Sequence, residues 1–234
     1  MNDLTAAFGL AFQLLIGLDA DLLEIVSLSL RVSLTAVGLA ALIGLPLGAA
    51  VALYRFPGRR LVAALLNAFM GLPPVVVGLL VYLILSRSGP LGVLGLLFTP
   101  GAMIIAQCLL VLPIVAALSA QTVADLNAEY DEQLRSLAAG PVQRLFTLLW
   151  DGRFSLLTAI LAGFGRAIAE VGAVMIVGGN IAHATRVMTT AIALETSKGD
   201  LALALGLGLV LIALALTINL LALALRDVAR PQYA

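Results

Sequence analysis

Long apolar runs without charged side chains constrain this sequence more than any other feature. Four such runs exceed twenty residues each: Val32–Tyr54, Leu61–Ser86, Gly101–Ala124 and Leu201–Leu225. One further run, Phe154–Ala182, is the fourth in chain order and contains only two charged residues, Arg166 and Glu170. A helix needs about 20 apolar residues to cross the hydrocarbon core of a bilayer. The runs therefore predict an all-α integral membrane protein with about five transmembrane helices.

Composition and charge exclude most other classes of protein. Of the 234 residues, 62% are hydrophobic and only 11% are charged, which excludes an ordinary soluble enzyme and a disordered chain. Thirteen basic and thirteen acidic residues cancel, so we expect membrane lipid and no nucleic acid as a partner. With one histidine and one cysteine, the chain has no His/Cys cluster, and we expect no metal site.

The chain is predicted to form a single transmembrane domain over residues 1–234. Residues 1–18 are too short an apolar segment to span comfortably, and an interfacial helix is the preferred interpretation. Residues 125–153 form the most charged stretch, but 29 residues cannot build a separate core. Gly44 and Gly48 have the spacing that lets two helices approach closely, either inside one subunit or at a dimer interface.

Basic residues predict the orientation. With five spans, the loops on one side and the C-terminal segment contain eight arginines, whereas the opposite loops contain only Arg87, Arg186 and Lys198. The protein is expected in a bacterial or archaeal plasma (inner) membrane. The positive-inside rule then places its N-terminus outside the cell and its C-terminus in the cytoplasm. Six spans with a cytoplasmic N-terminus would leave the same loops inside.

The charged stretch Asp125–Arg153 has the pattern of two short helices with a bend between them. Gly140 is expected to stop the first helix, and Pro141 to start the second. The second helix is amphipathic through Val142, Leu145, Phe146 and Leu149. The pattern alone fits either a compact knob on the cytoplasmic side or a solvated connector between two spans.

This stretch resembles the Glu-Ala-Ala loop of ABC-importer permeases, which docks on an ATPase. The segment Glu132–Gly140 occupies the place of the motif: Glu132 matches its Glu, and Leu137 matches the Leu that precedes its Gly. Gln133 and Leu134 depart from the two Ala, Ala138 stands where the Gly belongs, and Trp150–Asp151 replaces a Leu-Pro pair. The resemblance implies that the ATPase is contacted by Glu132, Arg135, Leu137, Ala138, Gly140 and Phe146.

A second resemblance lies in the fourth run. Gly163–Ala173 is similar to the Phe-x-Arg-Ala-x-x-Glu-x-Gly-Ala segment of oxyanion permeases, the importers of molybdate, tungstate and sulfate. The continuation Val174–Ile181 and Thr185–Ile192 resembles tungstate permeases most. The resemblance implies a type I ABC-importer permease core with a cytoplasmic coupling-helix loop. It also implies three kinds of partner: a second copy of the chain, two ATPase subunits and an extracytoplasmic oxyanion-binding protein.

The charged pair in the fourth run is a candidate for the translocation pathway. If the run were one helix, Arg166 and Glu170 would share a face at positions i and i+4. Charges at membrane depth are expensive and rarely face lipid, so the two residues are expected either to pair and brace helices or to contact the anion. Of these two roles, the sequence favours the first and predicts that Arg166 and Glu170 form a buried ion pair.

Backbone and hydroxyl donors near the outer end of that run offer a second route for an anion. Gly178, Gly179 and Asn180 allow backbone N–H groups to approach an ion, and Thr189 and Thr190 supply hydroxyls. The alternative is structural: the glycines stop a helix, and the threonines cap a short helix over Val187–Glu195.

Taken together, the sequence predicts the permease subunit of an ATP-driven importer of tungstate, with molybdate as a second candidate. No segment matches the phosphate-binding loop Gly-x4-Gly-Lys-Ser/Thr, so we expect no catalytic residue and no cofactor in this chain. ATP and Mg would be bound by the partner ATPase. Alternatives are a molybdate or sulfate permease on the same fold, or an ion-coupled secondary transporter or channel.

Overall fold

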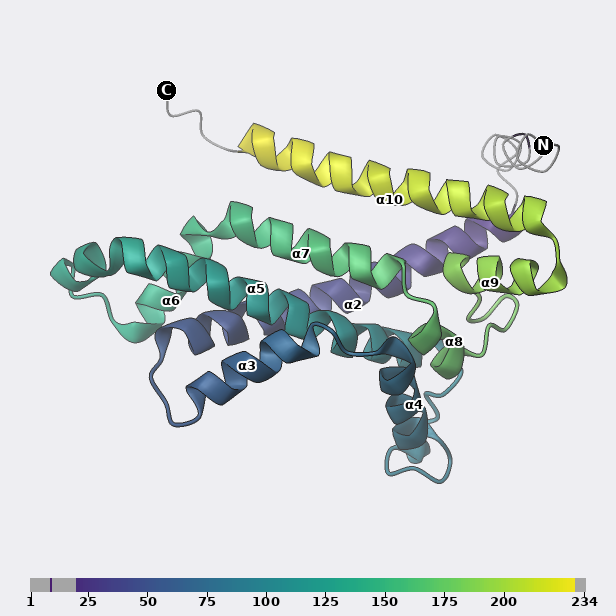
Figure 1. The fold of residues 1–234 in the computed structure, drawn as a ribbon, viewed down its shortest axis with the longest axis horizontal. Coiled ribbons are helices and arrows are strands. Elements are labelled where there is room, and N and C mark those ends of the chain that lie inside the picture. Colours follow the sequence, from purple (N-terminus) through teal and green to yellow (C-terminus); the bar gives the residue numbers. More distant parts are fainter. Residues whose placement is uncertain (1–8, 10–19, 230–234) are drawn as a thin grey trace. The chain divides into compact units, whose positions relative to one another are not determined.

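A computed structural model describes Gly9 and residues 20–229, which form helices joined by turns and short loops and contain no β-strand. Figure 1 shows the order of the helices along the chain. The α-helices are α2 (Ala20–Leu53), α3 (Arg59–Phe69), α4 (Pro74–Leu85), α5 (Pro100–Ser136), α6 (Pro141–Asp151), α7 (Arg153–Ile168), α8 (Gly172–Gly178), α9 (Met188–Lys198) and α10 (Leu201–Ala229), and a 3-10 turn η1 (Gly92–Leu94) precedes α5. The interfacial helix predicted for residues 1–18 lies outside the described residues except at Gly9.

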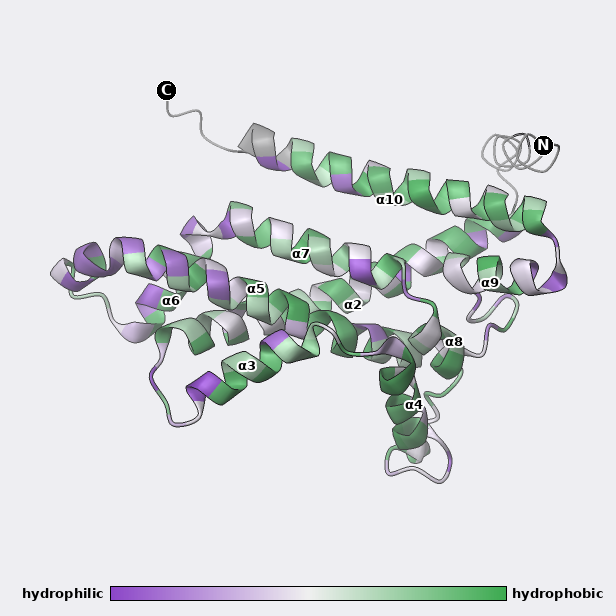
Figure 2. Cartoon of the chain, viewed as in Figure 1, coloured by the Kyte–Doolittle hydropathy of each residue, from purple (hydrophilic) through white to green (hydrophobic). Residues whose placement is uncertain are grey.

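Three helices, α2, α5 and α10, are long and apolar enough to cross a membrane. They confirm the first, third and fifth apolar runs as continuous helices. Two bent pairs, α3 with α4 and α6 with α7, raise the number of candidate spans to five if each pair counts as one. In Figure 2, α4 and α10 are almost entirely apolar, whereas hydrophilic residues gather at the end of α5 and in α6.

The second apolar run does not form the single helix that was predicted. Helix α3 ends at Phe69, and α4 begins at Pro74. Pro73 precedes α4 in an extended conformation, with φ −65° and ψ 120°, and Pro74 is its first residue. Proline lacks the N–H that a continuing helix would need and is pre-organised to begin a new one. Pro46 and Pro113, by contrast, lie inside α2 and α5.

The fourth run is also divided. Helix α7 ends at Ile168, and the short helix α8 begins at Gly172, which leaves Glu170 in the break. Helix α8 ends at Gly178, and Gly179 after it has a left-handed φ of 72° that suits a glycine C-cap. The expectation that Arg166 and Glu170 share one helix face is therefore wrong, because the helix ends between them.

The helices belong to two compact units. Among the described residues, unit 1 comprises Gly9, 20–35, Pro73–Gln107 and Ile168–Leu225, and unit 2 comprises Ala36–Leu72, Cys108–Ala167 and 226–229. The core of unit 1 includes Leu22, Met188, Ala191, Leu207 and Val210. The core of unit 2 includes Ala49, Val123, Leu134, Leu145 and Leu148. The long helices α2 and α5 each contribute one part to unit 1 and another to unit 2.

Within unit 2, the paired glycines of α2 bring its backbone against α5. A Cβ on Gly48 would lie 2.2 Å from the Ala116 carbonyl oxygen, and one on Gly44 would lie 3.3 Å from the Leu112 carbonyl oxygen. The Ser119 hydroxyl also donates a hydrogen bond to the Leu45 carbonyl oxygen at 2.8 Å. This contact lies inside one chain, which resolves the two alternatives left open by the Gly44/Gly48 spacing.

Within unit 1, α4 packs closely against α8 (Figure 1). A Cβ on Gly78 would lie 2.7 Å from the Ala173 Cα, so the glycine allows the two backbones to approach. The close packing holds α8 next to the break in the fourth run, and the polar residues described below surround that break.

Candidate functional site

A cluster of buried polar side chains lies in unit 1. Ser29, Ser33, Gln107, Glu170 and Thr189, here called the polar cluster, are all less than a tenth exposed and line one small void with Val32, Ile168 and Val187. The two serines lie one turn apart on α2, Gln107 lies on α5, Glu170 lies in the α7–α8 break and Thr189 lies in the first turn of α9. Four segments distant in sequence therefore meet at this place.

Hydrogen bonds fix the cluster through the ends of helices. The Ser29 hydroxyl donates to the Ile25 carbonyl oxygen at 2.6 Å and accepts from the Met188 N–H at 2.8 Å, which satisfies the first N–H of α9. The Thr189 hydroxyl donates to the Glu170 carbonyl oxygen at 2.8 Å. The Glu170 carboxylate accepts from the Ala173 N–H at 3.0 Å, close to the start of α8.

The cluster consists of neutral hydroxyl and amide groups and one carboxylate, and the Ser29 and Thr189 hydroxyls already donate to carbonyl oxygens. Hydroxyls and an amide bind an oxyanion without the strong charge attraction that would prevent release. The void measures about 10 Å³, which is room for at most one water molecule. A tetrahedral oxyanion is larger than water, so helices must move before the cluster admits one.

The structure brings together two of the predicted pathway residues, Glu170 and Thr189, and uses others at helix ends. The Thr190 hydroxyl accepts from the Val187 N–H at 3.0 Å and donates to the Val187 carbonyl oxygen at 3.0 Å, so it caps α9. Gly178 and Gly179 end α8, as the structural alternative stated. Asn180 adopts φ 50° directly after them.

Sequence reasoning missed Ser29, Ser33, Gln107 and Thr185. The Thr185 hydroxyl joins the two sides of the loop after α8, because it donates to the Gly178 carbonyl oxygen at 2.6 Å and accepts from the Ile181 N–H at 3.0 Å. The signal in the sequence was weak: Ser29 and Ser33 have helical i,i+4 spacing, and Gln107 interrupts an apolar run. Serine and threonine are common in membrane helices without any role in transport.

Arg166 lies in the last turn of α7, half-buried, in unit 2. Because α7 ends at Ile168, Arg166 and Glu170 do not share a helix face that would pair their side chains. The ion pair stays a prediction.

The charged stretch Asp125–Arg153 covers the last part of α5, all of α6 and the first residue of α7. The first of the two predicted short helices is therefore the end of one continuous 37-residue helix, while the bend and α6 form the predicted knob. The predicted stop residue was also wrong. Helix α5 ends at Ser136, and Ala138 takes the left-handed conformation with φ 49°. The Ala139 N–H donates to the Leu134 carbonyl oxygen at 3.0 Å, and the Ala138 N–H donates to the Arg135 carbonyl oxygen at 2.9 Å. These two bonds define a Schellman C-cap, in which the left-handed position favours glycine.

Gly140, in contrast, has an extended conformation with φ −68° that any residue can adopt. It precedes Pro141, which is the first residue of α6 as predicted. The left-handed cap at Ala138 is where the Glu-Ala-Ala motif has its glycine, so the motif's glycine corresponds to a structural requirement at position 138.

Helix α6 has two apolar faces. Leu145 and Leu148 are buried in the core of unit 2. Val142, Phe146 and Trp150 lie on the opposite face, and Phe146 is 65% exposed while Leu137, just before the helix, is 77% exposed. Exposed apolar side chains in a stripe outside the predicted spans indicate a surface that another molecule covers.

Charged residues connect α5 to α6 beside this stripe. The Asp131 carboxylate bonds to both Arg135 and Arg144, with N–O distances of 2.8 Å in each pair. Arg144 also donates to the Asp131 carbonyl oxygen at 3.2 Å. Glu132 is exposed next to them. Of the predicted coupling residues, therefore, Glu132, Arg135, Leu137 and Phe146 lie at the surface.

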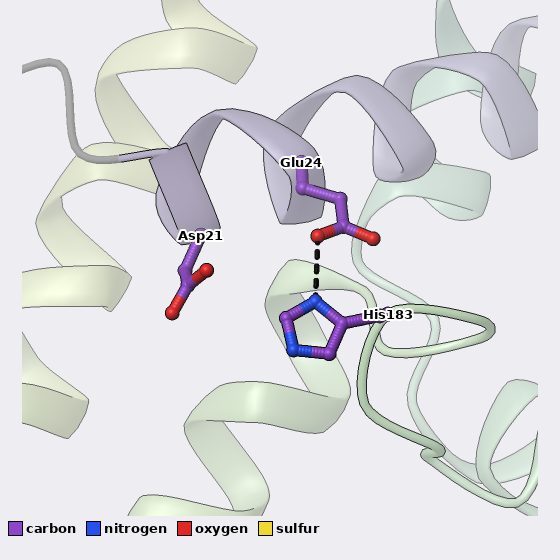
Figure 3. Close-up of side chains that lie close together, drawn as sticks. All are labelled: Asp21, Glu24 and His183. Atoms are coloured by element: carbon purple, nitrogen blue, oxygen red, sulfur yellow. Dashed lines mark hydrogen bonds and ion pairs between the residues drawn. The ribbon is translucent and has the colours of Figure 1, made fainter.

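Three exposed residues that could ligate a metal gather at the start of α2. Figure 3 shows Glu24 bonded to the His183 ring, at 2.8 Å, with Asp21 nearby. The potential ligand atoms of Asp21, Glu24 and His183 lie within 4.8 Å of one another. The hydrogen bond that the His183 ring donates to the Glu24 carboxylate is the main reason that the pKa of His183 is raised. Arg186 lines the same cleft, and its positive charge disfavours a cation there.

A helical chain with several candidate spans, a buried polar cluster and an exposed apolar knob has the features of a multi-pass membrane transport component. Residues 44–233 match the family described as "Binding-protein-dependent transport system inner membrane component". The chain belongs to this family, which has the type I ABC permease fold. It is a multi-pass inner-membrane protein, and membership implies a binding protein and an ATPase as partners.

Individual relatives lie close in sequence. The chain is 42% identical over 200 residues to the tungstate uptake system permease protein TupB of Peptoclostridium acidaminophilum, covering 86% of this chain and 88% of the relative. It is 44% identical over 187 residues to a probable anion ABC transporter permease protein of Haloferax volcanii, covering 77% and 80%. It is 40% identical over 149 residues to TupB of Campylobacter jejuni, covering 64% and 62%.

Proposed function

We propose that this chain is the permease subunit of an ATP-binding-cassette importer that carries tungstate into the cell, with molybdate as a second candidate. The observation that supports this most is the 42% identity over 86% of the chain to a protein named as a tungstate uptake permease. The polar cluster supplies neutral hydroxyl and amide groups buried among helices. For it to bind an oxyanion, the Ser29 and Thr189 hydroxyls would have to leave their carbonyl partners and the Glu170 carboxylate would have to turn away or be protonated.

The proposed complex contains two copies of this chain, two ATPase subunits and an extracytoplasmic oxyanion-binding protein. The N-terminus lies outside, and α6 lies on the cytoplasmic side, where the basic loops are. The chain binds no nucleotide itself: ATP and Mg are held by the ATPase subunits, so it is not an enzyme on its own. Cysteine labelling tests the orientation. In a variant whose Cys108 is replaced by Ala, a cysteine placed at Gln143 should react only from the cytoplasm, and one placed at Ser197 only from outside.

We propose that the exposed stripe of α6 docks into a cleft on the ATPase. Leu137 and Phe146 supply apolar contact, while Glu132 and Arg135 beside them set the register. Ala138 shapes the turn, because its left-handed conformation directs the chain from α5 toward α6. Gly140 contributes only as the residue before α6.

Replacing an exposed apolar residue by an acid tests this docking. Phe146→Asp and Leu137→Asp should each abolish co-purification of the ATPase, since a carboxylate would be buried at the interface. The fold should survive, because both side chains are exposed. Val93→Asp makes the same change at a fully exposed residue of unit 1, in η1, and should retain the ATPase. Normal co-purification and transport with both α6-side variants would refute the docking.

The transported anion is tested with the reconstituted complex and its binding protein. Tungstate should stimulate ATPase activity most, molybdate less and sulfate least. Stimulation by sulfate or molybdate alone would favour the alternatives of a sulfate or molybdate permease on the same fold. If no ATPase co-purified, and uptake followed a proton or sodium gradient instead, the chain would be a secondary transporter or channel.

A further inference from the structure

The segment between α2 and α3 forms a basic cleft in unit 2. Arg55, Phe56, Gly58, Arg59 and Arg60 line a space of about 330 Å³, and no acidic side chain lines it. Gly58, with φ 84°, turns the chain into α3, whose first two residues are Arg59 and Arg60. Phosphate groups are the anions that arginine recognises best, because the guanidinium offers a planar fork of donors.

One of the three arginines has a structural task, and two do not. Arg59 donates from Nε to the Val51 carbonyl oxygen at 2.7 Å and from Nη2 to the Ala52 carbonyl oxygen at 2.8 Å, which satisfies the end of α2. Arg55 and Arg60 are exposed and have no hydrogen bond or ion pair with any residue that the structure describes. Their charges are therefore available to a ligand.

An apolar stripe begins directly after the cleft. Leu61, Leu65 and Phe69 lie one turn apart along α3 and are 64%, 41% and 44% exposed. None of the residues of α3 is buried. A helix with arginines at its start and an exposed apolar face has the pattern of a segment that lies at the boundary between headgroups and acyl chains.

We propose that the cleft and this stripe together bind an anionic phospholipid: Arg55 and Arg60 hold the headgroup phosphate, and Leu61, Leu65 and Phe69 contact an acyl chain. A free phosphate would use only the arginines and would leave the stripe exposed, so the stripe favours a lipid. This site is separate from the transported anion and from the ATPase docking surface, and it does not depend on the proposed cargo.

Native mass spectrometry of the purified full chain, with phosphatidylglycerol or phosphatidylcholine added, tests the site. Wild type should retain phosphatidylglycerol more strongly. An arginine near an anionic lipid contributes about 1 kcal/mol, so Arg55→Gln/Arg60→Gln should weaken phosphatidylglycerol binding on the order of 30-fold. Single replacement of Arg60 by Gln should weaken it about 5-fold. Arg87→Gln, an exposed arginine of unit 1, is the matched control and should leave it unchanged.

Two further measurements keep the test independent of insertion and folding. Leu65→Asn retains every arginine, and it should weaken phosphatidylglycerol binding because the acyl contact is lost. Inorganic phosphate should not displace the lipid; full displacement would show a site for free phosphate and overturn the proposal. Equal retention of the two lipids by wild type would also overturn it, as would an unchanged preference for phosphatidylglycerol in the double-glutamine variant.

Discussion

Unit 1 contains seven of the eight buried polar side chains among the described residues, whereas unit 2 contains only Ser119. The difference is visible along a single helix. In its first part, α2 directs Ser29 and Ser33 into the polar cluster, and in its second part Gly44 and Gly48 lie against α5. The same helix thus serves a hydrogen-bonded site in one unit and close backbone packing in the other.

The two kinds of packing differ in what they tolerate. Close packing of backbones has no space to adjust, because the nearest atoms to Gly48 are the backbone of Ala116 and Ala120 and the Ser119 Cβ. A hydrogen-bonded cluster instead holds its members by the direction of each bond. A substitution at Gly48 therefore meets the backbone of a neighbouring helix, whereas a substitution in the cluster removes the partner of a buried polar group.

The largest expected effect is at Gly48. Gly48→Ala places a methyl group 2.2 Å from the Ala116 carbonyl oxygen, so α2 and α5 must separate. The loss of stability should be about 2–3 kcal/mol. Gly38→Ala lies in the same helix, in unit 2, with no atom within 4 Å, and should gain up to about 1 kcal/mol from helix propensity. Thermal unfolding in detergent measures both, and similar melting temperatures would contradict the close packing of unit 2.

The next effect compares one buried hydroxyl from each unit. Thr185→Val removes the partner of both the Gly178 carbonyl and the Ile181 N–H, and should cost about 2 kcal/mol. Ser119→Ala removes one hydrogen bond to the Leu45 carbonyl and should cost about 1 kcal/mol. Both residues are fully buried, so the same melting experiment compares them fairly. A larger loss from Ser119→Ala would contradict the view that unit 1 is the part held by side-chain hydrogen bonds.

The helices were predictable where hydropathy alone decides. Uncharged runs predicted α2, α5 and α10 because a long apolar segment has no other stable form in a bilayer. The break at Pro73–Pro74 carried a signal, two adjacent prolines, that apolarity masked. The break around Glu170 had no such signal: the Thr189 hydroxyl, nineteen residues away, bonds to the Glu170 carbonyl oxygen. Tertiary contacts of this kind cannot be read from local pattern.

The candidate sites were predictable to different degrees for the same reason. Glu170 was predicted because a charge in an apolar run is costly, and Thr189 because its hydroxyl is a donor near the outer end of that run. The place of Ser29 in the polar cluster could not be predicted, because a serine in a helix usually bonds to the carbonyl oxygen four residues earlier, as Ser29 does with Ile25. Its second bond, to the Met188 N–H, depends on the fold. In unit 2, the resemblance to the Glu-Ala-Ala loop correctly located the turn between α5 and α6. The local pattern predicted Gly140 as the residue that stops the helix, whereas the left-handed residue is at position 138.

That turn gives a smaller prediction for unit 2. Ala138 pays for a left-handed conformation with φ 49°, so Ala138→Gly should raise stability by about 1 kcal/mol. Gly140→Ser places a capping hydroxyl before α6 and should be no less stable than wild type, because the backbone there is extended. Melting temperatures decide. A stability loss from Ala138→Gly, or a clear loss from Gly140→Ser, would return the glycine requirement to position 140.

The smallest expected effect is the pH dependence of unit 1 at the contact between His183 and Glu24. The hydrogen bond that His183 donates to the Glu24 carboxylate, with the negative charges of Glu24 and Asp21, raises the pKa of His183 above its usual value of 6.5. A raised pKa in the folded state means that the contact stabilises the protein fully below pH 6.5 and that this contribution disappears as pH rises through the folded pKa. His183→Gln should therefore melt below wild type in mild acid and equally with it at alkaline pH.

Glu24→Gln, measured across the same pH range, should remove the same pH-dependent difference, since it removes the partner while His183 stays. A difference from wild type that persists unchanged to alkaline pH would show that the loop after α8 is held by packing rather than by this ion pair.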